Sequence, residues 1–227
     1  MNNTPDNLLI TLRDCVPFAR GGKRACYVHP DQPDRCIKLP LPDQQPADLY
    51  RRAPWHRRLR KSILDFDENH REWQAIHWLE CQRDDTVWQH VPCCHGWTDT
   101  DLGRGLVVHL CREPGGGISP NLIDYLRSHG GTPAVRTAID HFAAFWTVRR
   151  IPAHDFMINN LVCQTRADGT LHIWMIDGLG CRTFLPVAQW FTFAGRRDAR
   201  RRIQCLHQRF DRTLVRLGSA RPTEPRL

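Results

Sequence analysis

Asp155 and Asn160 lie five residues apart in HDFMINNLVC, residues 154–163, and both carry side-chain oxygens that can take part in catalysis. In phosphoryl-transfer enzymes this spacing lets an aspartate face the attacking hydroxyl while an asparagine binds magnesium. The same stretch also fits a plain turn between a helix and a strand. What the rest of the chain contains decides between these two interpretations.

Lys38 and Glu72 are the next candidates for chemistry. Lys38 lies in RCIKLPL, residues 35–41, which we expect to form a strand. Glu72 lies in a predicted helix over 67–81, within an apolar stripe at helical spacing. Burying an ionised glutamate is costly unless a cation lies nearby, and Lys38 is a candidate for that cation. Alternatively, Glu72 lies at the rim of the stripe and contacts water.

The elements that surround these two residues are mostly strands. FARGGKRACYVHP, residues 18–30, predicts a hairpin, because adjacent glycines permit a tight turn. Another strand is expected at 8–16, and residues 91–111 predict two short strands around a turn at 99–105. The stretch between residue 41 and the helix is Pro-rich and basic, and we expect it to be a connector.

The elements that position the D-x4-N stretch are mostly helices. REPGGGISP, residues 112–120, predicts a hinge. Beyond it, helices are predicted over 121–131, 133–150 and 196–217, and a hairpin with an Asp-Gly turn leads to Asp177. We therefore expect an α+β fold with two lobes, in which the hinge divides a sheet-rich lobe at 1–111 from a helical lobe at 121–227.

The chain has 227 residues and a net charge of +8, and its positive charge is concentrated in two Arg-rich patches at 51–61 and 195–204. Such patches can attract nucleic acid, anionic lipid or phosphorylated ligands, although most are simply solvated faces. No helix-turn-helix, ribonucleoprotein or zinc-finger signature accompanies them, so no specific nucleic-acid motif is present.

Ten cysteines raise the question of disulfides or zinc. We find neither a signal peptide nor an apolar run of transmembrane length, and we therefore expect a cytoplasmic protein with reduced thiols. Cys81, Cys93, Cys94 and His95 are the residues nearest to a zinc-binding pattern, but they contain no C-x-x-C pair.

Taken in order, these parts follow the protein-kinase-like pattern: glycine turn, strand lysine, helix glutamate, hinge, D-x4-N loop and Asp-Gly. The chain resembles most closely the YrbL family, the kinase-like proteins of the PhoP regulatory network. The stretches that carry the resemblance are ACYVHP at 25–30, RCIKL at 35–39, REW at 71–73, INNLVC at 158–163, IDGLG at 176–180 and LPVAQW at 185–190.

The resemblance implies a bilobal kinase-like fold with a reduced C-terminal lobe, which binds ATP and Mg²⁺. It implies that Lys38 holds the α- and β-phosphates and that Glu72 orients this lysine. Gly21 and Gly22 match the loop that lies over the phosphates, where backbone N–H groups can approach them.

The same resemblance assigns the transfer step to the second lobe. Asp155 matches the catalytic aspartate that accepts the hydroxyl proton, and Asn160 and Asp177 match the two metal ligands. Both ligands offer the hard oxygens that magnesium prefers.

Three departures keep several functions open. Ala19-Arg20 replaces the glycine that usually opens the loop, and Met157 stands where protein kinases usually have a lysine. In addition, only 50 residues follow Asp177, and no protein-docking region is visible among them. We therefore expect a phosphotransferase with an unknown acceptor, a small molecule or sugar lipid rather than a protein. The alternatives are a nucleotide-binding pseudokinase that acts as a regulatory module and a basic adaptor for nucleic acid or anionic lipid.

Overall fold

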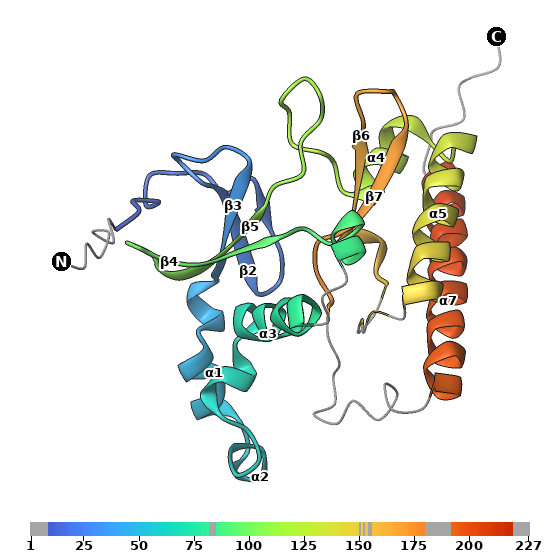
Figure 1. Ribbon diagram of the computed structural model, residues 1–227. Coiled ribbons are helices and arrows are strands. Elements are labelled where there is room, and N and C mark those ends of the chain that lie inside the picture. Colours follow the sequence, from blue (N-terminus) through green and yellow to red (C-terminus); the bar gives the residue numbers. More distant parts are fainter. Residues whose placement is uncertain are drawn as a thin grey trace. The chain divides into compact units, whose positions relative to one another are not determined.

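The computed structural model describes residues 9–81, 85–149, 151, 153, 156–179 and 192–219. The chain divides into two compact units, shown as a ribbon in Figure 1. The first unit comprises residues 1–83 and 92–110, and the second comprises 84–91 and 111–227. The mixture of helices and antiparallel strands confirms the predicted α+β class.

The first unit is built on a five-stranded antiparallel sheet with the strand order β1-β2-β3-β5-β4. Its core contains Leu12, Ile37, Leu39 and Val107. The predicted hairpin, the strand carrying Lys38 and the later strand pair are confirmed, except that the last turn is tighter than 99–105. The strands are β1 (Ala19–Arg20), β2 (Arg24–Val28), β3 (Arg35–Pro40), β4 (Cys94–Thr100) and β5 (Gly103–His109).

The strand predicted at 8–16 is wrong for the part that the structure describes. Ile10 makes one isolated bridge to Thr100. The next backbone N–H groups do not continue a ladder, because those of Leu12 and Arg13 donate to the Asp101 carboxylate at 2.7 and 3.1 Å. A side chain thus satisfies donors that a strand would pair with a neighbour.

The connector predicted between residue 41 and the helix is wrong, because the segment folds into short helices. These are η1 (Pro42–Gln44), α1 (Pro46–Arg52), α2 (Trp55–Arg58) and η2 (Ile63–Phe66). Prolines at the first turns of η1 and α1 explain this, since the fixed φ of proline suits the start of a helix. The following helix, α3 (Glu68–Cys81), confirms the prediction over 67–81.

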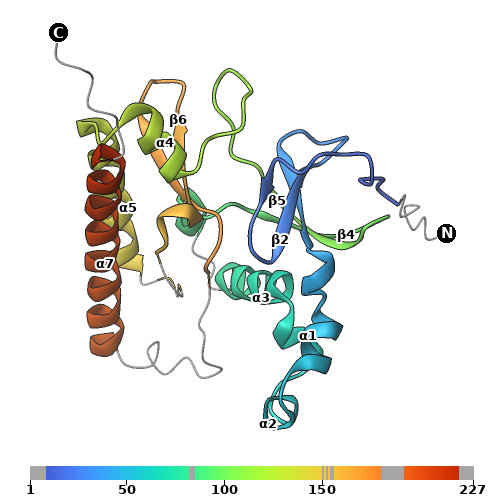
Figure 2. The same ribbon diagram turned by 180° about the vertical axis from the view of Figure 1, so that it is seen from behind.

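In the second unit, α5 packs against the β6–β7 hairpin and against α7. Both helices before the D-x4-N stretch are confirmed, as are the hairpin and the last helix, which is longer than predicted. The elements are η3 (Asp85–Gln89), α4 (Leu122–His129), α5 (Pro133–Arg149), η4 (Ile158–Asn160), β6 (Leu161–Thr165), β7 (Leu171–Met175) and α7 (Thr192–Ser219). Figure 2 shows α7 running alongside α5.

Three aromatic side chains pack together in the core of this unit. Phe142 and Trp146 on α5 both meet Phe156 edge to face, with ring centroids 5.7 and 5.2 Å apart. All three rings are almost completely buried. The chain just after the predicted catalytic aspartate is therefore anchored by a large apolar side chain. Within the described residues, no helix is both long and apolar enough to cross a membrane.

Candidate functional site

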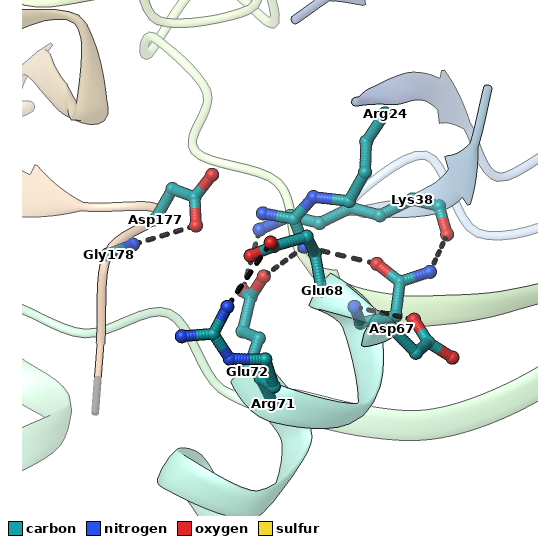
Figure 3. A network of polar contacts seen from close by, with 9 residues as sticks. Arg24, Lys38, Asp67, Glu68, Arg71, Glu72, Asp177 and Gly178 are labelled. Atoms are coloured by element: carbon teal, nitrogen blue, oxygen red, sulfur yellow. Dashed lines mark hydrogen bonds and ion pairs between the residues drawn. The ribbon is translucent and has the colours of Figure 1, made fainter. Parts of the chain in front are cut away.

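Lys38 and Glu72 form a buried ion pair in the first unit (Figure 3). The Lys38 ammonium on β3 lies 2.6 Å from Oε1 of Glu72 on α3. Their side chains are each 6% exposed, which excludes the alternative that Glu72 contacts bulk water at the rim of its stripe. Because two buried charges have lost their hydration and compensate each other, this pair holds the lysine in one position.

Arg24 on β2 is a second cation on the same carboxylate, and no motif in the sequence pointed to it. Its Nη1 lies 2.5 Å from Oε2 of Glu72 and donates to Oδ1 of Asn69 at 3.1 Å. Asn69 in turn donates from Nδ2 to the Lys38 carbonyl at 2.8 Å. Four buried polar residues from β2, β3 and α3 thus form one connected network.

The strand register contains the signal that could have revealed Arg24. Cys26 on β2 pairs with Lys38 on β3, and Arg24 stands two residues before Cys26. Residues two apart on a strand share a face, so Arg24 is on the same face of the sheet as Lys38. The hairpin turn sets this register, and its residue pairing was not part of the prediction.

Glu68 extends the network toward solvent. Its Oε1 accepts from Lys23 at 2.5 Å and from Arg71 at 3.2 Å. Burial raises the pKa of the Glu68 carboxyl, but the hydrogen bond and charge of Lys23 together with Arg71 outweigh it, so the pKa is lowered overall. Glu68 is thus held as a carboxylate at the first turn of α3, where negative charge stabilises a helix.

Gly21 and Gly22 lie in the exposed turn between β1 and β2, as expected for a hairpin loop. Gly21 closes the turn by donating to the Arg24 carbonyl at 2.9 Å. A Cβ atom on Gly22 would meet nothing within 4 Å. The turn is open, and its backbone is accessible from outside.

Asn160 and Asp177 come together at one end of the β6–β7 hairpin in the second unit. Leu161 pairs with Met175, and the residue after Met175, Ile176, donates its N–H to the Asn160 carbonyl at 2.9 Å. Asp177 follows directly, and its Oδ1 accepts from the Gly178 N–H at 2.7 Å (Figure 3). Gly178 has a φ of 88°, a conformation that favours glycine.

Asp155, the predicted catalytic residue, lies outside the described residues, as does His154. Of the described residues that follow them, Phe156 is buried and Met157 is 41% exposed. Arg209 on α7 donates to the Phe156 carbonyl at 3.0 Å, and Arg202 donates to the Ala153 carbonyl. Arg202, in the Arg-rich patch at 195–204, therefore has a structural role that was not predicted from the sequence.

Among the described residues, no group of three or more His, Cys, Asp and Glu side chains gathers in a way that could hold a metal ion. This includes Cys81, Cys93, Cys94 and His95. Burial is the main cause of a raised pKa at both Cys93 and Cys94. Both thiols are therefore protonated at neutral pH in the structure as described.

The comparison that decides the family is a match of residues 10–211 to the model of the PhoP regulatory network protein YrbL. The chain belongs to the YrbL family. The matched range includes the ion network of the first unit and the hairpin that carries Asn160 and Asp177. The resemblance noted from short motifs is therefore confirmed over most of the chain.

Two relatives in the YrbL family are "Uncharacterized protein YrbL" of Escherichia coli (strain K12) and of Shigella flexneri. Each is 22% identical over 187 residues, which is 80% of this chain and 79% of the relative. Among solved structures, this chain is similar to the crystal structure of Rad53 1–466 in complex with AMP-PNP. That similarity has a TM-score of 0.44 and 11% identity, and it covers 85% of this chain and 46% of the other.

Proposed function

We propose that this member of the YrbL family is a kinase-like phosphotransferase that uses ATP and Mg²⁺. The observation that carries the proposal is the buried 2.6 Å pair of Lys38 and Glu72, reinforced by Arg24. A lysine held by a carboxylate in this way is a preoriented point charge, which suits phosphate oxygens. The exposed turn at Gly21 and Gly22 offers backbone N–H groups as a second phosphate contact.

The proposal assigns metal binding to the second unit. Asn160 and Asp177 fit magnesium in their donor chemistry, because an amide and a carboxylate both provide hard oxygen ligands. The Gly178 N–H fixes one carboxylate oxygen of Asp177. Magnesium would neutralise charge on the phosphates, and Asp155 would accept the proton of the acceptor hydroxyl. The acceptor that we favour is a small molecule or a sugar lipid.

Thermal unfolding with and without ATP and Mg²⁺ tests the proposal. A ligand at about 100 times its Kd stabilises the folded state by about 2.7 kcal/mol, which should raise the Tm of the wild-type chain by several degrees. Lys38→Met and Asp177→Ala should each abolish the shift. Lys61→Met, a control that removes an exposed lysine, should retain it. An unchanged wild-type Tm at millimolar ATP would rule the proposal out.

A second candidate, a nucleotide-binding pseudokinase that acts as a regulatory module, is favoured by one observation. Met157 is substantially exposed at the position where a kinase usually presents a lysine to the moving phosphate. This candidate predicts the same thermal shift without turnover. ATP hydrolysis that disappears in Asp155→Asn would decide for the phosphotransferase.

A further inference from the structure

Residues 54–64 are folded, and yet every one of them is exposed. The segment comprises α2 and the chain leading into η2. Four large apolar side chains lie within it: Trp55 is 70% exposed, Leu59 76%, Ile63 46% and Leu64 52%. Single exposed apolar residues are common on proteins, but four within ten residues form a local patch that needs an explanation.

The same segment carries a concentrated positive charge. Residues 51–61 contain five arginines and one lysine and no acidic residue, and all six cations are exposed. Only Arg51 has an acidic partner among the described ion pairs, the neighbouring Asp48. We call residues 51–64 the basic apolar projection, since it carries both cationic and large apolar side chains.

The base of the projection is fixed. Tyr50 and Phe66 meet edge to face, with ring centroids 5.9 Å apart. At the start of η2, Ser62 and Asp65 form a capping box, in which the Ser62 N–H donates to Oδ2 of Asp65 at 2.7 Å. Figures 1 and 2 agree that α2 lies beyond α1, on the side away from the sheet. The projection thus presents a preformed surface.

We propose that the basic apolar projection docks on the surface of an anionic lipid bilayer. Tryptophan prefers the headgroup level of a membrane, where its ring is apolar and its N–H stays hydrated. Leucine and isoleucine side chains can enter the boundary of the acyl chains. The arginines and lysine around them would bind lipid phosphates, while their long stems lie along the apolar surface.

The same observations argue against other occupants. A second copy of the chain would bring a patch with six like charges against this one, which costs free energy. Nucleic acid would use the cations and could stack on Trp55, but it offers no apolar environment to Leu59, Ile63 and Leu64. An anionic bilayer is complementary to both the charge and the apolar side chains.

Vesicle flotation tests this proposal with vesicles of phosphatidylcholine alone and with vesicles that contain about 30% phosphatidylglycerol. We expect binding to the anionic vesicles only, and weaker binding as salt is raised. Removing three charges in Arg57→Gln/Arg58→Gln/Arg60→Gln should weaken binding on the order of a hundredfold. A matched variant that removes three exposed arginines of α7, Arg200→Gln/Arg201→Gln/Arg212→Gln, should bind almost as the wild type does.

A charge-neutral variant separates lipid from other polyanions. Trp55→Gln/Leu59→Gln leaves every cation in place, and because both side chains are exposed the fold should retain its Tm. Its affinity for the anionic vesicles should fall at least tenfold, because less apolar surface is buried in the membrane. Undiminished vesicle binding, or tighter binding of the wild type to a single-stranded oligonucleotide at the same salt, would overturn the proposal. The result is independent of ATP binding, so each proposal can fail without the other.

Discussion

Glu72 is the residue on which the ion network of the first unit converges. Each of its two carboxylate oxygens binds a different cation, Lys38 on one and Arg24 on the other. Both cations are buried with it, on strands β3 and β2. Removing the carboxylate therefore affects two buried charges, whereas removing Lys38 leaves Arg24 on Glu72.

We predict that Glu72→Gln is more destabilising than Lys38→Met. Breaking a buried ion pair by removing one partner costs about 3–5 kcal/mol, and here the carboxylate serves two cations. Urea unfolding should show Glu72→Gln losing at least that amount and Lys38→Met clearly less. Glu80→Gln on the same helix is the control, since Glu80 is exposed and pairs only with His77 among the described ion pairs. Equal losses of unfolding free energy in Glu72→Gln and Glu80→Gln would contradict the prediction that Glu72 stabilises two buried cations.

Of the two cations that bind Glu72, the sequence could reveal Lys38 but not Arg24. A glutamate in an apolar stripe requires a cation, and that requirement pointed correctly to Lys38. Arg24 could not be assigned in the same way, because its face depends on strand register. A shift by one residue would have turned it to the opposite face.

At the scale of elements, the contact of β5 with β3 depends on Gly105. A Cβ atom at this position would lie 2.4 Å from Cγ2 of Ile37 and 3.3 Å from the Lys38 carbonyl. Cγ2 is attached directly to the β-carbon of a branched side chain, so it cannot move aside by rotating a distant bond. The close approach of these strands thus helps to position the segment that carries Lys38.

We predict that Gly105→Ala destabilises the protein by about 1–3 kcal/mol, the usual effect of overpacking a core. Thermal or urea unfolding measures it. Gly117→Ala is a matched control, because a Cβ there would meet nothing within 4 Å. That control should be neutral or should stabilise the protein by up to about 1 kcal/mol, because alanine lowers the conformational entropy of the unfolded chain. A neutral Gly105→Ala would mean that the two strands separate easily.

Elements with a strong periodic pattern were predicted correctly, and elements with competing signals were not. α5 has a long apolar stripe and a proline at its start, so its limits were clear. Residues 42–66 combine prolines with a dense run of cations, which typify a connector, although each proline can also begin a helix. The weak alternation at 8–16 was outweighed by the Asp101 side chain.

At the scale of the whole molecule, a pair of buried histidines joins distant parts of the second unit. His90 and His172 stack with ring centroids 4.5 Å apart. His90 donates from Nδ1 to the Ile173 carbonyl at 2.7 Å, and Nε2 of His172 donates to the Gln89 carbonyl at 2.5 Å. The pair thereby fastens residues 85–91 to β7.

Both histidines are held neutral. Burial lowers the pKa of His172 to about 4, and the nearby His90 and Arg166 act in the same direction. Arg166 donates to Nδ1 of His172 at 2.8 Å, so a proton on that nitrogen would face another donor. Burial also lowers the pKa of His90, with Arg166 and His141 contributing in the same direction.

We predict that the protein loses stability as the pH falls from about 6.5 to about 4. In this range His172 binds a proton in the unfolded chain but stays neutral in the folded protein. Its contribution is therefore fully present above pH 6.5 and is lost on acidification, by about 3 kcal/mol. Urea unfolding across this range should show a shallower pH dependence for His172→Gln. The exposed control His56→Gln should follow the wild type, and identical slopes for all three proteins would contradict the assignment.

Residues 84–91 belong to the second unit, although the chain on both sides of them belongs to the first. The polypeptide therefore passes from one unit to the other three times. A fragment ending at Leu110 would contain residues 84–91 without the unit that they pack in. A fragment starting at Cys111 would lack His90, which contacts Ile173 and His172 on β7. The boundary between Leu110 and Cys111 therefore does not separate two complete modules, because a cut there removes residues 84–91 from the second unit.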